Sequence, residues 1–458
     1  MSMELADKTF LVVGLGKTGK STVEFLVRRG ARVVVSDARP ERELGDELTA
    51  FTRGAPVEMH LGGHDPALVA GVDGIVPSPG VPPRNVLLRE GLKRTIPVLS
   101  EIELASRFIR KPIIAVTGTN GKTTTTELLG RIFTHCGKEV FVGGNLGTPF
   151  ITAVEADEAV DLHVVEVSSF QLQWVHTFHP TVAVLLNVSV DHVDYHGSFE
   201  EYRAVKERVF ACQDQGDLAI LNAEDPRTAL LAREIEAEVA LFSSARRVDN
   251  GMYVEGNDLI STGAEGVKEV CPVSEIGLKG THNLENVMAA VMTARWCGCP
   301  AAPVKEAVRD FQGIPHRIEY VGGRDGIEYY NDSKGTNVGA VLRALEAFDG
   351  QIVLLMGGRH KGGRFSDLRK AMQGKVKRLI LFGEAREAIA TEIADAVKTL
   401  RVERMSDAVT KASEEAANGD VVLLSPGCAS FDEFKDYKER GEVFRQAVHA
   451  ITGSEDRG

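Results

Sequence analysis

Two glycine-rich loops, each placed between an apolar strand and a helix, constrain the fold of this chain most. The first is GLGKTGKST, residues 14–22, which follows the apolar run TFLVVG. The second is TGTNGKTTTT, residues 117–126, which follows the run IIAVTG. Glycine allows a tight turn close to a phosphate group, and the N-terminus of the helix that follows favours anions. The chain is therefore predicted to hold two separate phosphate-binding loops in an α/β fold.

The remaining apolar runs extend this alternation of strands and helices along the chain. They include EVFVGG, LHVVEVSS, VAVLLNV, LAILNAED, IVLLMGG, RLILFG and VVLLSPG, whereas NGMYVEGNDLIS predicts a small hairpin. Runs that are apolar throughout are typical of parallel strands covered on both faces. A chain of 458 residues is too long for one ordinary core. We predict three doubly wound or Rossmann-like domains.

Composition excludes several classes of protein. The net charge of −12 argues against general binding to nucleic acid, and no apolar stretch approaches the 18–20 residues of a membrane span. The first residues are typical of a strand and not of a signal peptide. Six scattered cysteines without a C-x-x-C pair predict reduced thiols in a cytoplasmic protein, and the pair Cys297 and Cys299 is weak metal spacing.

The first loop matches two phosphate-binding patterns at once. Gly14, Gly16 and Gly19 fit the dinucleotide pattern G-x-G-x-x-G. Lys20 and Ser21 complete G-x-x-x-x-G-K-[ST], the pattern of a nucleoside-triphosphate loop. We expect both residues in the first helical turn, where the second match arises by chance.

The strand after this loop supports the dinucleotide-like interpretation. It ends at Asp37, which lies 18 residues past Gly19, near the spacing of an acid that reaches a ribose hydroxyl. This spacing favours a nucleotide-diphosphate site, and a tight strand–helix turn without a ligand is the alternative.

The second loop fits the triphosphate pattern incompletely. Gly118 and Gly121 free the backbone, Lys122 can reach the β- and γ-phosphates, and Thr123 offers a hydroxyl to Mg²⁺. Val116 occupies the position of the first glycine of the pattern.

A buried acid adds to this second site. Glu166 lies in VVEVSSFQL, within an apolar strand and near a predicted sheet end, where a carboxylate suits Mg²⁺. A satisfied acid at a strand end is the alternative.

Motifs spread over nearly the whole chain resemble those of the Mur ligase family. They are TGTNGKTTTTELL, GGNLGTP, VVEVSSFQL, LNVSVDHVDYHGSFEEYRAVK, KGTHNLENVMAAV, GIPHRIE, YYNDSKGTN and SPGCASFDEFKDYKERGEVF, in family order. NDSKGTN and SPGCASFDEF favour the member type that adds D-glutamate to UDP-N-acetylmuramoyl-L-alanine. The D-N-P-R motif of the member that adds a diamino acid is absent.

The resemblance implies an ATP-dependent ligase of peptidoglycan precursor synthesis that works through an acyl phosphate. It implies ATP at the second loop with two Mg²⁺ ions, and UDP at the first. The expected domains are a Rossmann-like UDP-sugar domain over 1–98, a central P-loop-type ATPase domain over 99–313, and a Rossmann-like amino-acid domain over 314–458. We expect a monomer that binds neither nucleic acid nor membrane, and whose C-terminal domain closes on its ligands.

Site residues follow from the resemblance, position by position. It assigns catalysis to Lys122, Glu166, His192, Lys206 and Arg317. It assigns metal binding to Thr123, Glu166, His192 and Lys206, the last as a carbamate. It assigns ATP binding to Gly118, Thr119, Asn120, Gly121, Lys122, Thr123, Thr124, Asn283, Asn286, Arg317 and Asp332. It assigns the UDP substrate to Gly14, Thr18, Asp37, Ala38, Arg39, Ser78, Asn145, His192 and Lys334. It assigns D-glutamate to Thr336, Lys361, Ser430 and Tyr437.

Simpler interpretations of several residues stay open. Lys206 alone is typical of a solvated helix lysine, although Ser198 and Glu201 form a capping-box pattern that starts its helix. A transition-metal cluster is the alternative for His192, Asp194 and His196.

Turns, caps and helix packing would explain several more of these residues. Asn145 fits a plain Gly-Asn turn, Asn283 a helix cap and Arg39 an exposed loop charge. Lys361 fits a flexible basic loop, in which His360 replaces an Asp common in the family. Tyr437, commonly Phe in relatives, fits amphipathic-helix packing.

Three other functions compete with the ligase. A nicotinamide-dependent dehydrogenase would use the first loop and Asp37, but it leaves the second loop and the last domain without a role. A nucleotide sensor without catalysis is the second. Another Mur ligase, or an amide ligase similar to folylpolyglutamate synthase, is the third.

Overall fold

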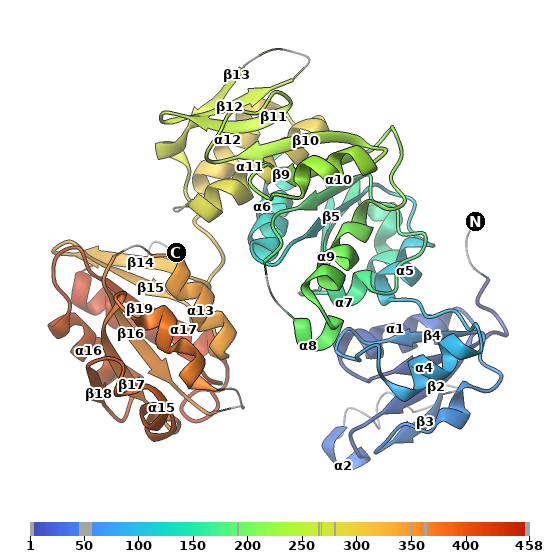
Figure 1. Ribbon diagram of the computed structural model, residues 1–458, viewed down its shortest axis with the longest axis horizontal. Helices are drawn as coiled ribbons and strands as arrows, with labels where there is room; N and C mark the ends of the chain where they lie inside the picture. Colours follow the sequence, from blue (N-terminus) through green and yellow to red (C-terminus); the bar gives the residue numbers. More distant parts are fainter. Residues whose placement is uncertain are drawn as a thin grey trace. The chain divides into compact units, whose positions relative to one another are not determined.

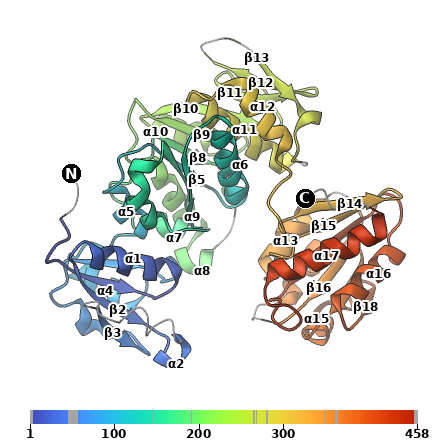
Figure 2. The same ribbon diagram turned by 180° about the vertical axis from the view of Figure 1, so that it is seen from behind.

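The computed structural model describes residues 4–44, 57–145, 147–189, 192–263, 266, 268–278, 281–348, 350–360 and 364–453. The chain divides into two compact units, Met1–Phe311 and Gln312–Gly458. Figure 1 shows the first unit in blue to yellow and the second in orange to red, and Figure 2 shows them from behind. No described helix is both long and apolar enough to cross a bilayer.

The N-terminal part is a parallel sheet of order β3-β2-β1-β4. Its strands are β1 (Thr9–Val13), β2 (Arg32–Asp37), β3 (Val57–Leu61) and β4 (Gly74–Pro77). Its helices are α1 (Lys17–Arg28), α2 (Glu41–Leu44) and α4 (Val86–Lys93), with a 3₁₀ turn η1 (Pro66–Val69). Helix α1 begins at Lys17, so Lys20 and Ser21 are its fourth and fifth residues.

The central part is a nine-stranded sheet of order β13-β12-β11-β10-β9-β8-β5-β7-β6. Its strands are β5 (Ile113–Thr117), β6 (Val140–Gly144), β7 (Leu162–Glu166), β8 (Val182–Leu185), β9 (Leu218–Asn222), β10 (Glu238–Ser243), β11 (Gly251–Glu255), β12 (Asp258–Thr262) and β13 (Lys268–Pro272). Strands β5 to β11 pair in parallel, and β11 pairs with β12 in the predicted antiparallel hairpin.

Helices and short 3₁₀ segments connect the strands of this sheet. They are α5 (Glu101–Ser106), α6 (Lys122–His135), α7 (Ser169–Leu172), α8 (Val193–His196), α9 (Phe199–Glu207), α10 (Thr228–Glu234), α11 (Thr281–Trp296) and α12 (Ala301–Asp310), with 3₁₀ segments η2 (Phe150–Ala159), η3 (Arg208–Phe210) and η4 (Val273–Glu275). Helix α6 follows the second glycine loop and packs against α11 and α12.

The second unit is a six-stranded sheet of order β14-β15-β19-β16-β17-β18, parallel except for β14. Its strands are β14 (Glu319–Arg324), β15 (Ile327–Asn331), β16 (Ile352–Gly357), β17 (Val376–Phe382), β18 (Thr399–Arg401) and β19 (Val421–Gly427). Its helices are α13 (Val338–Glu346), α14 (Arg369–Met372), α15 (Arg386–Ile393), α16 (Met405–Glu415) and α17 (Tyr437–Thr452), with η5 (Phe365–Leu368).

Both faces of this second sheet are covered, as its apolar strands require. One core joins the sheet to α13, η5 and α15, and another joins it to α16 and α17. Figure 2 shows α17 lying across one face. The predicted α/β class is confirmed, with glycine-rich loops at the carboxyl ends of parallel strands, where α/β proteins bind their ligands.

Candidate active site

The second glycine loop has the backbone of a phosphate cradle. Gly118 has φ +151° and Gly121 has φ +83°, values that strongly favour glycine. The segment that follows strand β8 hydrogen-bonds to the backbone of the loop. The N–H of Asn120 donates to Asn187 Oδ1 at 2.9 Å, and the N–H of Thr119 donates to the Asn187 carbonyl at 2.9 Å. These two hydrogen bonds fix the backbone of the loop against the segment after β8.

Two lysine ammonium groups converge on this loop. Lys122 Nζ donates to the carbonyls of Gly118 and Thr119, at 2.9 and 2.8 Å. Lys206 Nζ donates to the same Gly118 carbonyl at 2.8 Å and lies 4.8 Å from the Tyr202 ring centroid. Lys206 is only 2% exposed. The alternative of a solvated helix lysine is therefore wrong, because α9 buries the Lys206 side chain at the phosphate cradle.

Glu166 ends β7 beside the start of the same loop, because it pairs in register with Val116 of β5. It is 1% exposed, and its Oε1 accepts a hydrogen bond from Asn145 Nδ2 at 2.8 Å. Its Oε2 is buried, and no described residue donates to it. A buried carboxylate oxygen without a donor is costly unless a cation binds it, so this site fits Mg²⁺. Thr123, also buried, is the second residue of α6.

His192 and His196 occupy different environments. His192 is exposed, has φ +50°, and its ring lies against Phe170 at 4.7 Å between centroids. His196 is buried and its Nε2 lies 3.0 Å from Ser169 Oγ. The Asp194 side chain lies outside the described residues. The described contacts therefore give the alternative of a transition-metal cluster no support.

Helix α11 brings the side-chain amide of Asn286 close to this loop. A Cβ on Gly121 would lie 2.1 Å from Asn286 Oδ1, so the loop backbone approaches this amide closely. Asn286 Nδ2 donates to Asn283 Oδ1 at 3.3 Å. Thr124 follows Thr123 in the first turn of α6. The structure thus brings Lys122, Lys206 and Asn286 to one loop. Glu166, at the end of β7, lies beside the start of this loop, and Asn145 hydrogen-bonds to it.

The first loop is held by its own acid. Asp37 is 4% exposed, and its Oδ2 accepts the N–H of Leu15 at 2.6 Å and Arg39 Nη2 at 2.8 Å. Burial opposes ionisation of Asp37, but Arg39 and the backbone N–H groups outweigh it and lower the pKa to about 2. The Asp37 carboxylate, which the sequence analysis assigns to a ligand, is thus already hydrogen-bonded to the glycine loop and to Arg39.

Other residues predicted at this first loop surround it. Ser78 Oγ donates to the Gly14 carbonyl at 2.7 Å, and a Cβ on Gly19 would lie 2.1 Å from that carbonyl oxygen. Thr18 is in the first turn of α1, and Ala38 is exposed beside Arg39.

In the second unit, the predicted residues gather on the loops after β15 and β19. Asp332 is 5% exposed and accepts Ser425 Oγ at 2.7 Å. Lys334 and Thr336 follow it and are half-buried, whereas Ser430 is 2% exposed after β19. Tyr437 is the first residue of α17. Lys361 lies outside the described residues.

Arg317 lies between two residues with strained backbones. His316 has φ +66° and Ile318 has φ +45°. Non-glycine residues with positive φ persist only where their surroundings enforce them, and they cluster at functional sites. The His316 ring is fixed by Asn331 Nδ2 at 3.0 Å, and burial lowers its pKa.

Arg440 is a residue that the sequence interpretation missed. It is fully buried, and its guanidinium donates to Ser333 Oγ at 3.0 Å, the Ser333 carbonyl at 2.8 Å and the Cys428 carbonyl at 3.1 Å. Burial lowers its pKa to about 10. Arg440 thereby ties the loop of Asp332 to the loop of Ser430. It lies within KERGEVF, where an arginine on an amphipathic helix gives no signal of burial.

We expect Arg440→Ala to lower the free energy of unfolding of the second unit by about 3 kcal/mol or more, because two buried carbonyls lose their donors. Denaturant unfolding followed by circular dichroism measures the loss. The control is Arg401→Ala, whose side chain is 48% exposed, with an expected change within about 0.5 kcal/mol. Equal losses in both variants would contradict the assigned role.

Three of the cysteines, Cys271, Cys299 and Cys428, are buried, and the other three are partly exposed. All six are free thiols, and burial raises the pKa of Cys297 to about 11 and that of Cys299 to about 12. Within the described ranges, the only cluster of three possible metal ligands is His179, Asp214 and Asp217, which includes no cysteine.

Family models match the chain in three consecutive segments. They are a Mur ligase MurD-like N-terminal domain at residues 8–100, a Mur ligase middle domain at 116–294 and a Mur ligase glutamate ligase domain at 316–428. The three-domain α/β architecture predicted from the sequence is confirmed.

Relatives match over nearly their full length. A UDP-N-acetylmuramoylalanine–D-glutamate ligase from Syntrophus aciditrophicus is 50% identical over 449 residues, 98% of this chain and 99% of that protein. The protein of the same name from Acidobacterium capsulatum is 44% identical over 454 residues, 99% of this chain and 98% of that protein.

Solved structures share the fold at low identity. A pseudomurein peptide ligase type C from Methanothermus fervidus has a TM-score of 0.56 at 20% identity, covering 97% of this chain and all of that one. A UDP-N-acetylmuramate-alanine ligase from Thermotoga maritima has a TM-score of 0.54 at 19% identity, covering 97% and 99%. The order of the motifs, the three domain matches and the relatives at 44–50% identity agree, and the chain belongs to the Mur ligase family.

Proposed function

We propose that this chain is an ATP-dependent ligase that joins D-glutamate to UDP-N-acetylmuramoyl-L-alanine during peptidoglycan precursor synthesis. The relatives at 43–50% identity over 98% of the chain carry that name. The observation that carries the proposal is the cradle of Gly118–Lys122, on which two lysines converge beside the buried carboxylate of Glu166. That combination suits a triphosphate with a divalent cation.

The chemistry requires activation of a carboxylate. Oxide is a poor leaving group, so an oxygen of the substrate carboxylate first attacks the γ-phosphorus of ATP, and ADP leaves. The amine of D-glutamate then attacks the acyl phosphate, a tetrahedral intermediate forms, and phosphate departs as the amine loses its proton. Positioning and charge neutralisation are the main tasks of the protein.

The central residues divide these tasks. Lys122, already directed into the loop, neutralises the β- and γ-phosphates. Glu166 Oε2 and the Thr123 hydroxyl would hold one Mg²⁺, and His192 with a carbamate on Lys206 would hold a second. Bound Mg²⁺ supplies charge neutralisation of the phosphates. Asn286 and Asn283 lie at the loop where the adenine side of the nucleotide would bind.

The other loops receive the substrates in this proposal. The first glycine loop binds the UDP group at the N-terminus of α1, where Asp37 shapes the loop and Arg39 offers a positive charge. Asn145 faces the acceptor. Arg440 joins the two loops of the second unit that take part in binding the substrates. Thr336, Ser430 and Tyr437 bind D-glutamate together with Lys361, and Lys334 binds the acceptor. Arg317 and Asp332 bind ATP.

A phosphate-release assay tests the proposal. Purified protein receives ATP, Mg²⁺, UDP-N-acetylmuramoyl-L-alanine and D-glutamate, and we expect release that needs all four. L-alanine or a diamino acid replaces D-glutamate in parallel. Release that prefers either replacement would assign a different ligase, and no release from folded protein would reject ligation. Tight binding of NAD(H), measured by fluorescence, would favour the dehydrogenase.

Two further properties belong to this proposal. We propose that the enzyme acts as a monomer in the cytoplasm, where its nucleotide substrates are made. Residues of both units are assigned to binding the same ATP molecule, so we expect catalysis to require closure of the second unit on the nucleotide. Small-angle scattering with and without ligands is expected to differ, and identical profiles would count against closure.

A further inference from the structure

Glu319, the first residue of β14, has a carboxylate that connects three segments of the second unit. Its Oε2 accepts hydrogen bonds from the N–H of His316 at 2.8 Å and from Asn331 Nδ2 at 3.1 Å. Its Oε1 accepts a hydrogen bond from Arg445 Nη2 of α17 at 2.8 Å. The Glu319 side chain is 15% exposed, and no step above uses it.

Two of these partners directly precede residues that are assigned to ATP. His316 precedes Arg317, and Asn331, the last residue of β15, precedes Asp332. The antiparallel pairing of β14 with β15 places Glu319 opposite Asn331, so that one carboxylate oxygen contacts both partners. Glu319 therefore joins the turn that contains Arg317 to the end of the strand that leads into Asp332.

The turn that contains Arg317 needs such a contact, because its backbone is strained on both sides of this residue. The φ angle is +66° at His316 and +45° at Ile318, and values of this kind persist only where the surroundings enforce them. The His316 ring is confined by Asn331 Nδ2 at 3.0 Å and by the backbone of α17, because a Cβ on Gly441 would lie 2.1 Å from His316 Nδ1. The Glu319 carboxylate supplies the acceptor for the backbone N–H of the same residue.

Asp332 is fixed by other contacts. Its N–H donates to the Leu424 carbonyl at 2.7 Å, and its carboxylate accepts Ser425 Oγ at 2.7 Å, both within β19. These bonds do not depend on Glu319, whereas the strained turn would lose the acceptor of its His316 N–H. Loss of the Glu319 carboxylate should therefore move Arg317 relative to Asp332.

We propose that Glu319 is a positioning residue, which keeps Arg317 at a fixed position relative to Asp332 so that both residues contact one ATP molecule. The inference rests on the proposed function, which assigns these two residues to ATP. A displacement of about 1 Å, caused by a change away from the reacting atoms, can lower a rate about 100-fold.

The partners of Glu319 are all donors, which favours a carboxylate over an amide at this position. In Glu319→Gln one oxygen becomes an NH₂ group. That group faces either Arg445 or the pair of His316 and Asn331, so a hydrogen bond is lost in both orientations. The substitution keeps the side-chain volume, and the N–H of Lys334 still donates to the His316 carbonyl at 3.0 Å, so we expect the variant to fold.

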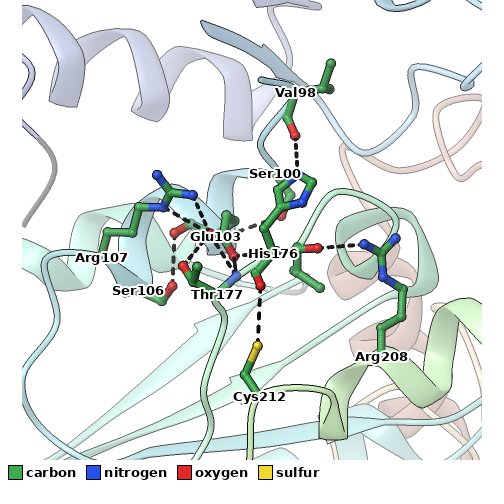
Figure 3. A network of polar contacts seen from close by, with 10 residues as sticks. Val98, Ser100, Glu103, Ser106, Arg107, His176, Thr177, Arg208 and Cys212 are labelled. Carbon is green, nitrogen blue, oxygen red and sulfur yellow. Dashed lines mark hydrogen bonds and ion pairs between the residues drawn. The ribbon is translucent and has the colours of Figure 1, made fainter. Parts of the chain in front are cut away.

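Glu103 of α5 provides a matched control in the first unit. It is completely buried, and it accepts hydrogen bonds from the N–H groups of His176 and Thr177, at 2.9 and 3.0 Å, and from Arg107 at 2.8 Å. Figure 3 shows this network, which ties α5 to residues 176–177. Glu103 thus has the same kinds of donor as Glu319, an arginine and backbone N–H groups, but none of these three partners is assigned to a ligand.

Steady-state kinetics of Glu319→Gln and Glu103→Gln in the full chain, below both thermal midpoints, test the inference. We expect Glu319→Gln to raise KM for ATP about tenfold and to lower kcat about tenfold. Its KM for the UDP substrate should stay within about threefold, because the loop assigned to UDP lies in the first unit. Glu103→Gln is expected to stay within about threefold on all three constants, although its thermal midpoint falls.

A double-mutant cycle measures whether Glu319 acts through Arg317. In protein that already carries Arg317→Ala, we expect Glu319→Gln to lower kcat/KM for ATP by less than about threefold, compared with about 100-fold in the wild type. A role in stability alone would give equal losses in both backgrounds, and that result would overturn the inference.

Hydrogen exchange gives a readout that needs no activity. We expect the peptide covering 314–320 to exchange faster in Glu319→Gln and at the wild-type rate in Glu103→Gln. Wild-type exchange of this peptide in Glu319→Gln, or an unchanged KM for ATP, would overturn the inference. A wild-type protein that releases no phosphate would instead overturn the proposed function, and the exchange comparison would still decide whether Glu319 fixes the turn.

Arg445→Met replaces Glu319→Gln if that variant does not fold. It removes the donor to Glu319 Oε1 and leaves both hydrogen bonds of Oε2. We expect a rise of about fivefold in KM for ATP, because the carboxylate is then fixed on one side only. An unchanged KM for ATP in Arg445→Met would overturn the inference equally.

Discussion

Lys122→Ala is expected to lower kcat of phosphate release by about 1,000-fold, because the transferred phosphoryl group loses its nearest cation. Lys122 Nζ lies 2.9 and 2.8 Å from two carbonyls of the loop that it would leave to reach the phosphates. The side chain is half-buried, so the fold should tolerate its loss. Single-turnover rates at saturating ATP measure the effect, and circular dichroism verifies folding.

Lys20→Ala is the matched control for this variant. Both lysines follow a glycine and precede a hydroxyl residue, and both lie on the helix after a strand. Lys20 belongs to the loop assigned to UDP, so we expect kcat within about threefold of wild type, with any change confined to KM for the acceptor. A large loss of kcat in Lys20→Ala, with normal turnover in Lys122→Ala, would exchange the roles of the two loops.

The pattern of apolar strands was sufficient to predict the α/β architecture. Buried parallel strands have a nearly continuous apolar run, and the glycine loops mark where each strand passes into a helix. Glu166 was predicted near a sheet end for the same reason, and it is the last residue of β7. These features are local in sequence, so the chain shows them without knowledge of its contacts.

Contacts between distant segments could not be predicted in this way. Asp37 has the spacing of a ribose-binding acid, but its carboxylate bonds the backbone of Leu15 and the side chain of Arg39. Arg440 and Ser333 are 107 positions apart in sequence, yet they form one buried pair. Hydrogen bonds of this kind depend on which loops the sheet order brings together, and sheet order is not readable from periodicity.

The burial of individual side chains was the other property that the sequence could not predict. Lys206 lies on α9, which begins with the predicted Ser198 cap, whose Oγ accepts the N–H of Glu201 at 3.1 Å. Nothing in EEYRAVKE distinguishes a buried lysine from a solvated one. Its burial follows from the packing of α9 against the glycine loop, where Tyr202 contacts Thr119 at 3.1 Å.

Lys206→Ala is expected to reduce turnover by about 1,000-fold, which a small carboxylate such as formate partly restores. A carbamate forms when the free amine attacks CO₂ and releases a proton, and it places a negative charge where the buried side chain meets the Gly118 carbonyl. Alanine removes the charge and leaves space for an exogenous carboxylate. The measurement is the phosphate-release rate at rising formate concentration, with chloride at equal ionic strength as the salt control.

Lys122→Ala separates this rescue from a general effect of carboxylates. Its missing group is a cation, so formate should restore nothing there, whereas it should restore turnover in Lys206→Ala. Protein equilibrated with ¹³C-bicarbonate is expected to give a carbamate signal by NMR that Lys206→Ala lacks. Full activity of Lys206→Ala without additive would refute the carbamate. Loss of turnover that neither formate nor chloride restores would assign Lys206 a role of its ammonium group, consistent with its contacts to Gly118 and the Tyr202 ring.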